Sequence, residues 1–69
     1  MDLSAAEVEA AHNHLKDLFK KNGQLRGCTS YVQRQMGVGY NHASRLIGVL
    51  VLSRIISEPD RFGERTWLK

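Results

Sequence analysis

Two glycines separated by one residue, Gly37 and Gly39, interrupt a stretch that otherwise has the pattern of two helices. Before them, Ser30 to Gln33 has the spacing of a capping box, which predicts that a short helix begins at Ser30. After them, apolar residues recur at helical offsets as far as about Ser53. Glycine accepts the positive φ values of a tight turn, so this stretch predicts two short helices joined by such a turn.

The second of these predicted helices has two distinct sides. Its apolar side is expected to pack in the core and consists of Ala43, Leu46, Ile47 and Leu50. Its polar side carries Asn41, His42 and Arg45, which the three- and four-residue offsets bring together. Beyond Leu46 the residues Val, Leu and Ile also suit a strand, although we favour a helix.

The flanking segments complete a fold pattern. Ser4 to Glu7 has capping-box spacing and begins a first predicted helix, which ends at Asn22-Gly23. The linking segment 24–29 has room for one brief strand, and residues 54–57 and 64–68 are β-formers around a turn rich in Pro, Asp and Gly. The apolar stripe of the first helix consists of Val8, Ala11, Leu15, Leu18 and Phe19. The sequence therefore predicts one mainly α domain over residues 1–69, a winged helix-turn-helix with three helices and a β-hairpin wing.

Composition excludes several classes of protein. The chain has a single cysteine, Cys28, so it has no internal disulfide and no thiolate zinc finger. His12 and His14 are two residues apart on the first predicted helix and do not share a face, which argues against a metal site. No nucleophile-base pair or paired carboxylates stand out, so we expect neither an enzyme nor a cofactor. An acidic N-terminus and the lack of a long apolar stretch predict a cytoplasmic protein without a membrane span.

Charge is distributed unevenly along the chain. Four of the seven acidic residues lie before residue 20, whereas residues 20–69 carry nine basic and three acidic side chains. In a winged helix-turn-helix the polar side of the third helix enters the major groove of DNA, and the hairpin reaches an adjacent groove or the backbone. The basic part of the chain is therefore the expected binding part, with duplex DNA as the partner.

The segment Ser30-Tyr-Val-Gln-Arg-Gln-Met-Gly-Val-Gly-Tyr-Asn-His-Ala-Ser-Arg-Leu-Ile resembles the helix-turn-helix of the C-terminal gamma domain of the FtsK/SpoIIIE DNA translocases. The match is close over residues 32–47, and its most distinctive parts are Val32-Gln-Arg-Gln35 and Gly39-Tyr-Asn41. The resemblance implies a winged helix that reads short G-rich sites which orient the translocase. It also implies contact with a tyrosine recombinase.

The resemblance assigns roles to individual residues. The DNA contacts that it implies are Asn41, His42 and Arg45 in the third helix and Arg61 and Arg65 in the hairpin. The surface that it associates with the recombinase consists of Gln33, Arg34 and Gln35. Four positions depart from the family pattern: His42 replaces a more basic residue, Gly48 and Val51 stand where glutamates are common, and Arg54 stands where a glycine is expected.

Two other interpretations remain open. The chain contains no Gly-x-x-x-x-Gly-Lys-Ser/Thr loop, so it has no motor of that kind. It is instead an excised domain or a free-standing relative, and its initiator methionine suggests a complete small protein encoded by a phage or another mobile element. A small transcriptional regulator of such an element is one alternative function. The alternative to DNA binding is a protein-interaction module that uses Gln33 to Gln35 and the apolar Val49, Val51 and Leu52 to bind a recombinase or a second copy. Tyr40 and Trp67 are expected to be core or rim aromatics.

Overall fold

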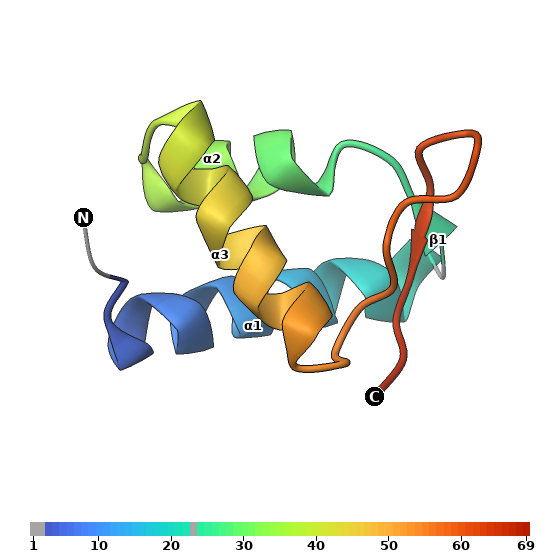
Figure 1. The fold of residues 1–69 in the computed structure, drawn as a ribbon, viewed down its shortest axis with the longest axis horizontal. Coiled ribbons are helices and arrows are strands. Elements are labelled where there is room, and N and C mark those ends of the chain that lie inside the picture. Colours follow the sequence, from blue (N-terminus) through green and yellow to red (C-terminus); the bar gives the residue numbers. More distant parts are fainter. Residues whose placement is uncertain (1–2, 23) are drawn as a thin grey trace.

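The computed structural model describes residues 3–22 and 24–69 and consists mainly of three helices (Figure 1). These are α1 (Ala5–Asn22), α2 (Cys28–Met36) and α3 (Tyr40–Leu52), and a two-stranded sheet is formed by β1 (Gln24–Leu25) and β2 (Arg65–Thr66). Each helix packs against the other two, with α3 lying across α1 and α2. The predicted fold class is confirmed.

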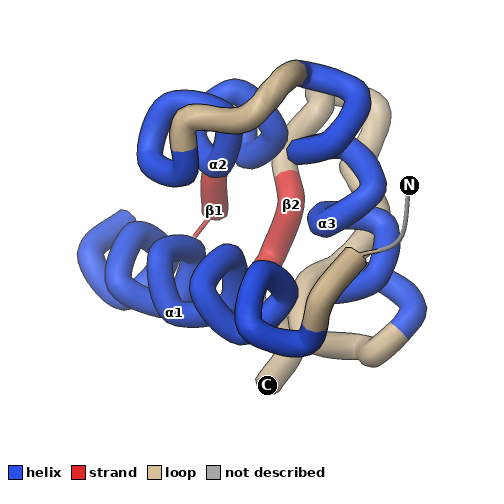
Figure 2. Tube along the Cα trace, turned by 90° about the vertical axis from the view of Figure 1, so that its left-hand side faces the viewer, coloured by secondary structure: helices blue, strands red, loops and turns tan. Residues whose placement is uncertain are grey.

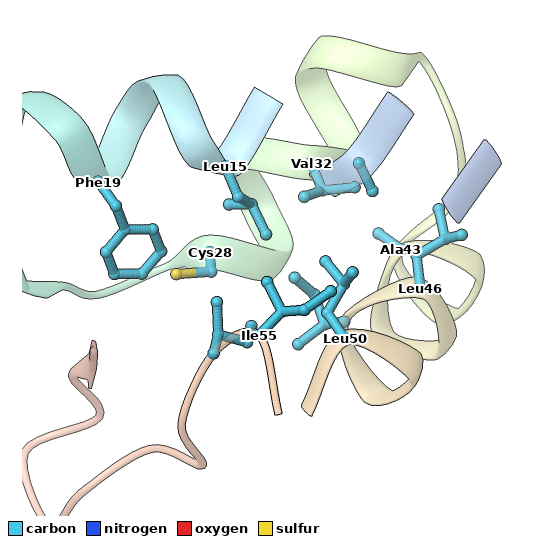
Figure 3. Packing of buried hydrophobic residues seen from close by; sticks show 11 residues of the cluster. Leu15, Phe19, Cys28, Val32, Ala43, Leu46, Leu50 and Ile55 are labelled. Atoms are coloured by element: carbon cyan, nitrogen blue, oxygen red, sulfur yellow. The ribbon is translucent and has the colours of Figure 1, made fainter. Parts of the chain in front are cut away.

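A single hydrophobic cluster fills the space between the helices (Figure 3). All four apolar residues predicted for α3 are buried there, with exposed fractions of 2% or less. Three of the five predicted for α1 are buried as well, and the other two pack against the cluster at its edge. The buried members are Ala11, Leu15, Phe19, Cys28, Val32, Ala43, Leu46, Ile47, Leu50, Ile55 and Ile56.

The predicted capping box at the start of α1 is confirmed. The backbone N–H of Glu7 donates to Oγ of Ser4 at 3.1 Å, and the backbone N–H of Ser4 donates to Oε1 of Glu7 at 3.3 Å. Two N–H groups that the helix itself leaves unpaired are thereby satisfied. The start of α1 is thus fixed by purely local chemistry.

The predicted start of α2 is wrong by two residues. The helix begins at Cys28 and Gly27 precedes it with φ of +66°, whereas Ser30 lies in the first turn and forms no capping box. The carbonyl of Gly27 accepts the N–H of Tyr31 at 3.0 Å. Cys28, the first residue of the helix, is buried in the core, so the helix start is fixed by tertiary packing as well as by local sequence.

The turn between α2 and α3 uses its two glycines differently. Gly37 has φ of +65° and lets the N–H of Val38 reach the carbonyl of Gln33 at 3.2 Å. Gly39 is extended, with φ of −71°, and precedes the first residue of α3. Of the two glycines that the sequence placed in a tight turn, only Gly37 therefore needs the left-handed region that glycine occupies at low cost.

The hairpin after α3 forms the predicted wing. Ile56 and Trp67 form an antiparallel bridge, and the N–H groups of Ser57 and Leu68 donate across the hairpin to Thr66 and Ile55. On its other side β2 pairs antiparallel with β1, aligning Gln24 with Thr66. The predicted brief strand in the 24–29 segment is thus present, and it lies beside the wing close to the end of α1 (Figure 2).

Arg54 joins α3 to the wing in an unusual conformation. Its φ is +61°, and among the described residues no other non-glycine has a positive φ. The N–H of Arg54 donates to the carbonyl of Val51, and that of Ile55 donates to the carbonyl of Leu50, both at 3.0 Å. This is the hydrogen-bond pattern of a Schellman motif, in which the left-handed position usually holds glycine. The family resemblance also predicted a glycine here.

Candidate nucleic-acid interface

One face of α3 is polar and open to solvent. Asn41, Ser44 and Arg45 are exposed, on the side away from the buried apolar residues of the same helix. At its N-terminal end this face contains a shallow depression lined by Gly39, Tyr40, Asn41, His42 and Arg45. Tyr40 is a rim residue with 58% of its surface exposed. The structure therefore brings the three residues predicted on this helix together at one site.

His42 points partly away from this open face. Its Nε2 lies 2.6 Å from Oε2 of Glu7 on α1, and only 15% of its side chain is exposed. The hydrogen bond from His42 lowers the pKa of Glu7 below its ordinary value, and the bond from the backbone of Ser4 acts in the same direction. His42 thus links α3 to α1, and its predicted contact with DNA stays a prediction.

A second depression runs between α3 and the hairpin, and its helix side is largely apolar. It is lined by Ser44, Ile47, Gly48, Val51 and Leu52 from the helix and by Glu58, Pro59 and Arg65 from the wing. Arg65 is half-buried, and its guanidinium donates to the carbonyl of Ser57 at 3.1 Å. This bond occupies one of the five N–H donors of the guanidinium. Arg65 therefore links the two sides of the hairpin through this hydrogen bond, and it also lines the depression next to α3.

The wing ends in an exposed turn that carries Arg61. The guanidinium carbon of Arg61 lies 5.6 Å from the ring centroid of Phe62, whose exposed fraction is 62%. Next to this turn, Nε of Arg26 lies 3.6 Å from Oε2 of Glu64. Sequence reasoning gave no role to Phe62 or to Arg26. A phenylalanine inside the turn Pro-Asp-Arg-Phe-Gly could have been predicted from the sequence to be exposed. The position of Arg26 beside the wing depends on tertiary structure and could not.

The three residues predicted to contact a protein lie elsewhere. Gln33, Arg34 and Gln35 belong to α2, where Arg34 and Gln35 are exposed and Gln33 is partly exposed. Neither depression described on α3 includes any of them. The residues predicted to contact a protein therefore lie on a different helix from the DNA contacts predicted on α3.

Three further features of the described residues concern metal ligands, the cysteine and the apolar character of the helices. Within residues 3–22 and 24–69, no three His, Cys, Asp or Glu side chains are grouped so that they could hold a metal ion. Cys28 is buried, and burial raises the pKa of its thiol. No described helix is both long and apolar enough to cross a membrane.

Comparison with known proteins identifies the family. The FtsK gamma domain matches residues 13–69. Over 59 residues the chain is 34% identical to the DNA translocase FtsK of Campylobacter jejuni serotype O:23/36 and 32% identical to that of serotype O:2. Each alignment covers 86% of this chain but only 6% of the relative. No solved structure matches. The chain therefore belongs to the FtsK gamma domain family, the DNA-binding domains of FtsK-type translocases.

Proposed function

We propose that this domain binds duplex DNA and reads short G-rich sites through the exposed face of α3 and the wing. The observation that carries the proposal is that two depressions follow one another along α3 and that the second reaches the wing. Asn41 and Arg45 line the depression at the start of α3, and Ser44 and Arg65 border the one that leads to the hairpin. A helix with an open polar face beside a β-hairpin is the arrangement that places side chains in a groove and on the flanking phosphates.

Arg45 is the residue that we assign to guanine recognition. A guanidinium forms two parallel hydrogen bonds with O6 and N7 of guanine, and one such pair contributes roughly 1 to 3 kcal/mol of discrimination against a wrong base. Asn41, one turn earlier, is placed for an adenine edge or a phosphate. Arg61 on the wing contacts phosphate, which adds affinity and salt dependence but little sequence preference.

We also propose that α2 contacts a tyrosine recombinase through Gln33, Arg34 and Gln35. The support is the exposure of Arg34 and Gln35 and the position of all three residues on a different helix from the proposed base contacts. In this proposal residues 1–69 act as one domain in the cytoplasm, where it meets chromosomal DNA. The domain itself performs no reaction, and any ATP-driven movement belongs to other parts of a translocase.

The test begins with selection from a pool of random duplexes. Bound DNA is sequenced, and the affinity for the enriched site is then measured by fluorescence anisotropy at two salt concentrations. Arg45→Ala is expected to weaken binding to the enriched site roughly 5- to 150-fold and to relax its sequence preference. Lys16→Ala removes one positive charge from an exposed position on α1 and serves as the matched control.

The outcomes separate the parts of this proposal. Enrichment of a G-rich asymmetric site that Arg45→Ala no longer prefers supports it. An inverted repeat points instead to a dimeric regulator, and equal losses in Arg45→Ala and Lys16→Ala show that α3 does not read bases. For the recombinase surface, Gln33→Ala combined with Arg34→Ala is expected to abolish capture of the recombinase and to leave DNA affinity unchanged. The reverse result removes α2 from the proposed interface.

A further inference from the structure

The tip of the wing presents an aromatic ring to solvent. The chain has two phenylalanines, and whereas Phe19 is 4% exposed in the core, Phe62 is 62% exposed in the turn of the hairpin. Its neighbours Asp60, Arg61 and Gly63 are also exposed. The ring is therefore a single large apolar group at the end of a polar hairpin, and it has no part in the hydrophobic cluster.

Several hydrogen bonds hold this turn in one shape. Oδ1 of Asp60 accepts the backbone N–H groups of Phe62 at 2.8 Å and of Glu64 at 3.0 Å. The backbone N–H of Asp60 donates to the carbonyl of Glu64, and that of Gly63 donates to the carbonyl of Asp60, both at 2.9 Å. Gly63 has φ of +79°, which glycine adopts at low cost. The ring is thus presented from a defined backbone, which reduces the entropy lost when it binds.

We propose that Phe62 packs its ring against the sugars lining the minor groove of duplex DNA, next to the site that α3 reads. Proteins that bind this groove combine apolar side chains with basic ones. The C–H groups of the deoxyriboses that line its walls offer an apolar surface to a ring. Arg61, whose guanidinium lies 5.6 Å from the ring centroid, supplies that positive charge beside the ring. The inference rests on the proposed DNA binding and adds a contact of a different chemical kind.

A protein partner fits this tip less well. The core of a protein interface is a contiguous apolar area, usually of several residues. Here one ring lies among exposed Asp60, Arg61 and Gly63. The carboxylate of Asp60 accepts two backbone N–H groups of the turn, whereas the guanidinium of Arg61 lies beside the ring and is suited to a phosphate. The chemistry around Phe62 therefore favours nucleic acid over a second copy of the chain or another protein.

The apolar contact of Phe62 can be distinguished from the charged contacts of the wing by the salt dependence of DNA binding. Phe62→Ala is expected to weaken binding to duplex DNA about tenfold, because most of an exposed ring then goes unburied. The slope of affinity against salt concentration is expected to stay the same, since no phosphate contact is lost. Arg61→Ala, in contrast, lowers that slope by about one. Leu68→Ala removes another exposed apolar side chain, 52% exposed in the same hairpin, and is the matched control.

A direct measurement uses the protein labelled with para-fluorophenylalanine, which places one fluorine on each phenylalanine. Fluorine NMR then reports the buried Phe19 and the exposed Phe62 separately, and Phe62→Ala assigns the two signals. On titration with the duplex obtained by selection, the Phe62 signal is expected to shift and to lose its sensitivity to exchange of water for deuterium oxide. The Phe19 signal is expected to stay in place.

The two proposals fail in different ways. If anisotropy shows binding while the Phe62 signal does not move, the Phe62 contact is wrong and DNA binding stands. A Phe62→Ala variant that binds as tightly as the unaltered protein leads to the same conclusion. If no duplex is bound at low salt, both proposals are overturned. A Phe62 signal that changes with protein concentration but not with DNA identifies the ring as a self-association contact and overturns this inference.

Discussion

Replacing Arg54 with glycine is expected to stabilise the domain, although the change removes an entire side chain. Arg54 occupies the left-handed position of the Schellman motif that ends α3, with φ of +61°. In this region the Cβ of an L-residue crowds its own backbone, which costs roughly 1 to 2 kcal/mol. The two hydrogen bonds of the motif, donated by Arg54 and Ile55, need this backbone shape and do not involve the guanidinium.

The expected net gain is smaller than the cost of the strain. Glycine is more flexible than arginine in the unfolded chain, which offsets about 0.5 to 1 kcal/mol of the benefit. Arg54→Gly is therefore expected to raise the free energy of unfolding by about 0.5 to 1 kcal/mol. In a domain of this size that corresponds to an increase in Tm of roughly 2 to 8 °C.

The measurement is urea unfolding at constant pH, followed by circular dichroism, together with thermal melts of the same samples. Arg54→Ala is the control, since it removes the guanidinium but keeps Cβ and therefore the strain. Its stability is expected to stay close to that of the unaltered protein. If Arg54→Gly is no more stable than the unaltered protein, or if Arg54→Ala gains as much, then backbone strain at this position is not the quantity that limits stability.

Three further changes test other parts of the structure. Gly48→Ala is expected to raise the free energy of unfolding by about 1 kcal/mol, measured by urea unfolding. Alanine is the better helix former, and a Cβ at this position meets no atom within 4 Å. A loss of stability would show that the added methyl group is not tolerated. The pKa of Glu7 is lowered in the folded protein by its hydrogen bond from His42, so its stabilising effect is complete above the pKa of the unfolded chain and is lost as pH falls through the folded value. Glu7→Gln is expected to flatten this acid-side fall in Tm, and an unchanged pH profile would contradict the assignment. Cys28 is buried, and burial raises the pKa of its thiol, so iodoacetamide is expected to alkylate it only when the domain opens. The alkylation rate is then expected to increase with urea concentration, and fast alkylation of the native protein would contradict the burial of Cys28.

Local patterns were sufficient to predict the three helices and much of the core. The apolar spacing of α3 identified Ala43, Leu46, Ile47 and Leu50, all of them buried, because a helix with one apolar face has only one way to pack it. The capping box of α1 was predictable for a similar reason. Both of its partners lie within one turn, so the hydrogen bonds depend on no other part of the fold.

Features that depend on the rest of the fold were not predictable in this way. The Ser30 to Gln33 spacing matched a capping box, yet the start of α2 is set by the backbone of Gly27 and the burial of Cys28. The bond between His42 and Glu7 joins residues 35 positions apart, and it forms because α3 packs on α1. Within the predicted interface, the grouping of Asn41, His42 and Arg45 could be predicted from helical offsets. The depression between α3 and the wing could not, because it depends on how the hairpin packs in the folded domain.

The pairing of β1 with β2 also affects the order in which the domain assembles. It aligns Gln24 with Thr66 and Leu25 with Arg65, so each pair closes a loop of about forty residues. The turn between α2 and α3, in contrast, brings together helices only a few residues apart in the chain. Contacts between distant residues form late, because the loop entropy is lost before the contact compensates for it. During synthesis the helices can therefore associate before the wing forms, since the residues of the wing follow all three helices in the chain.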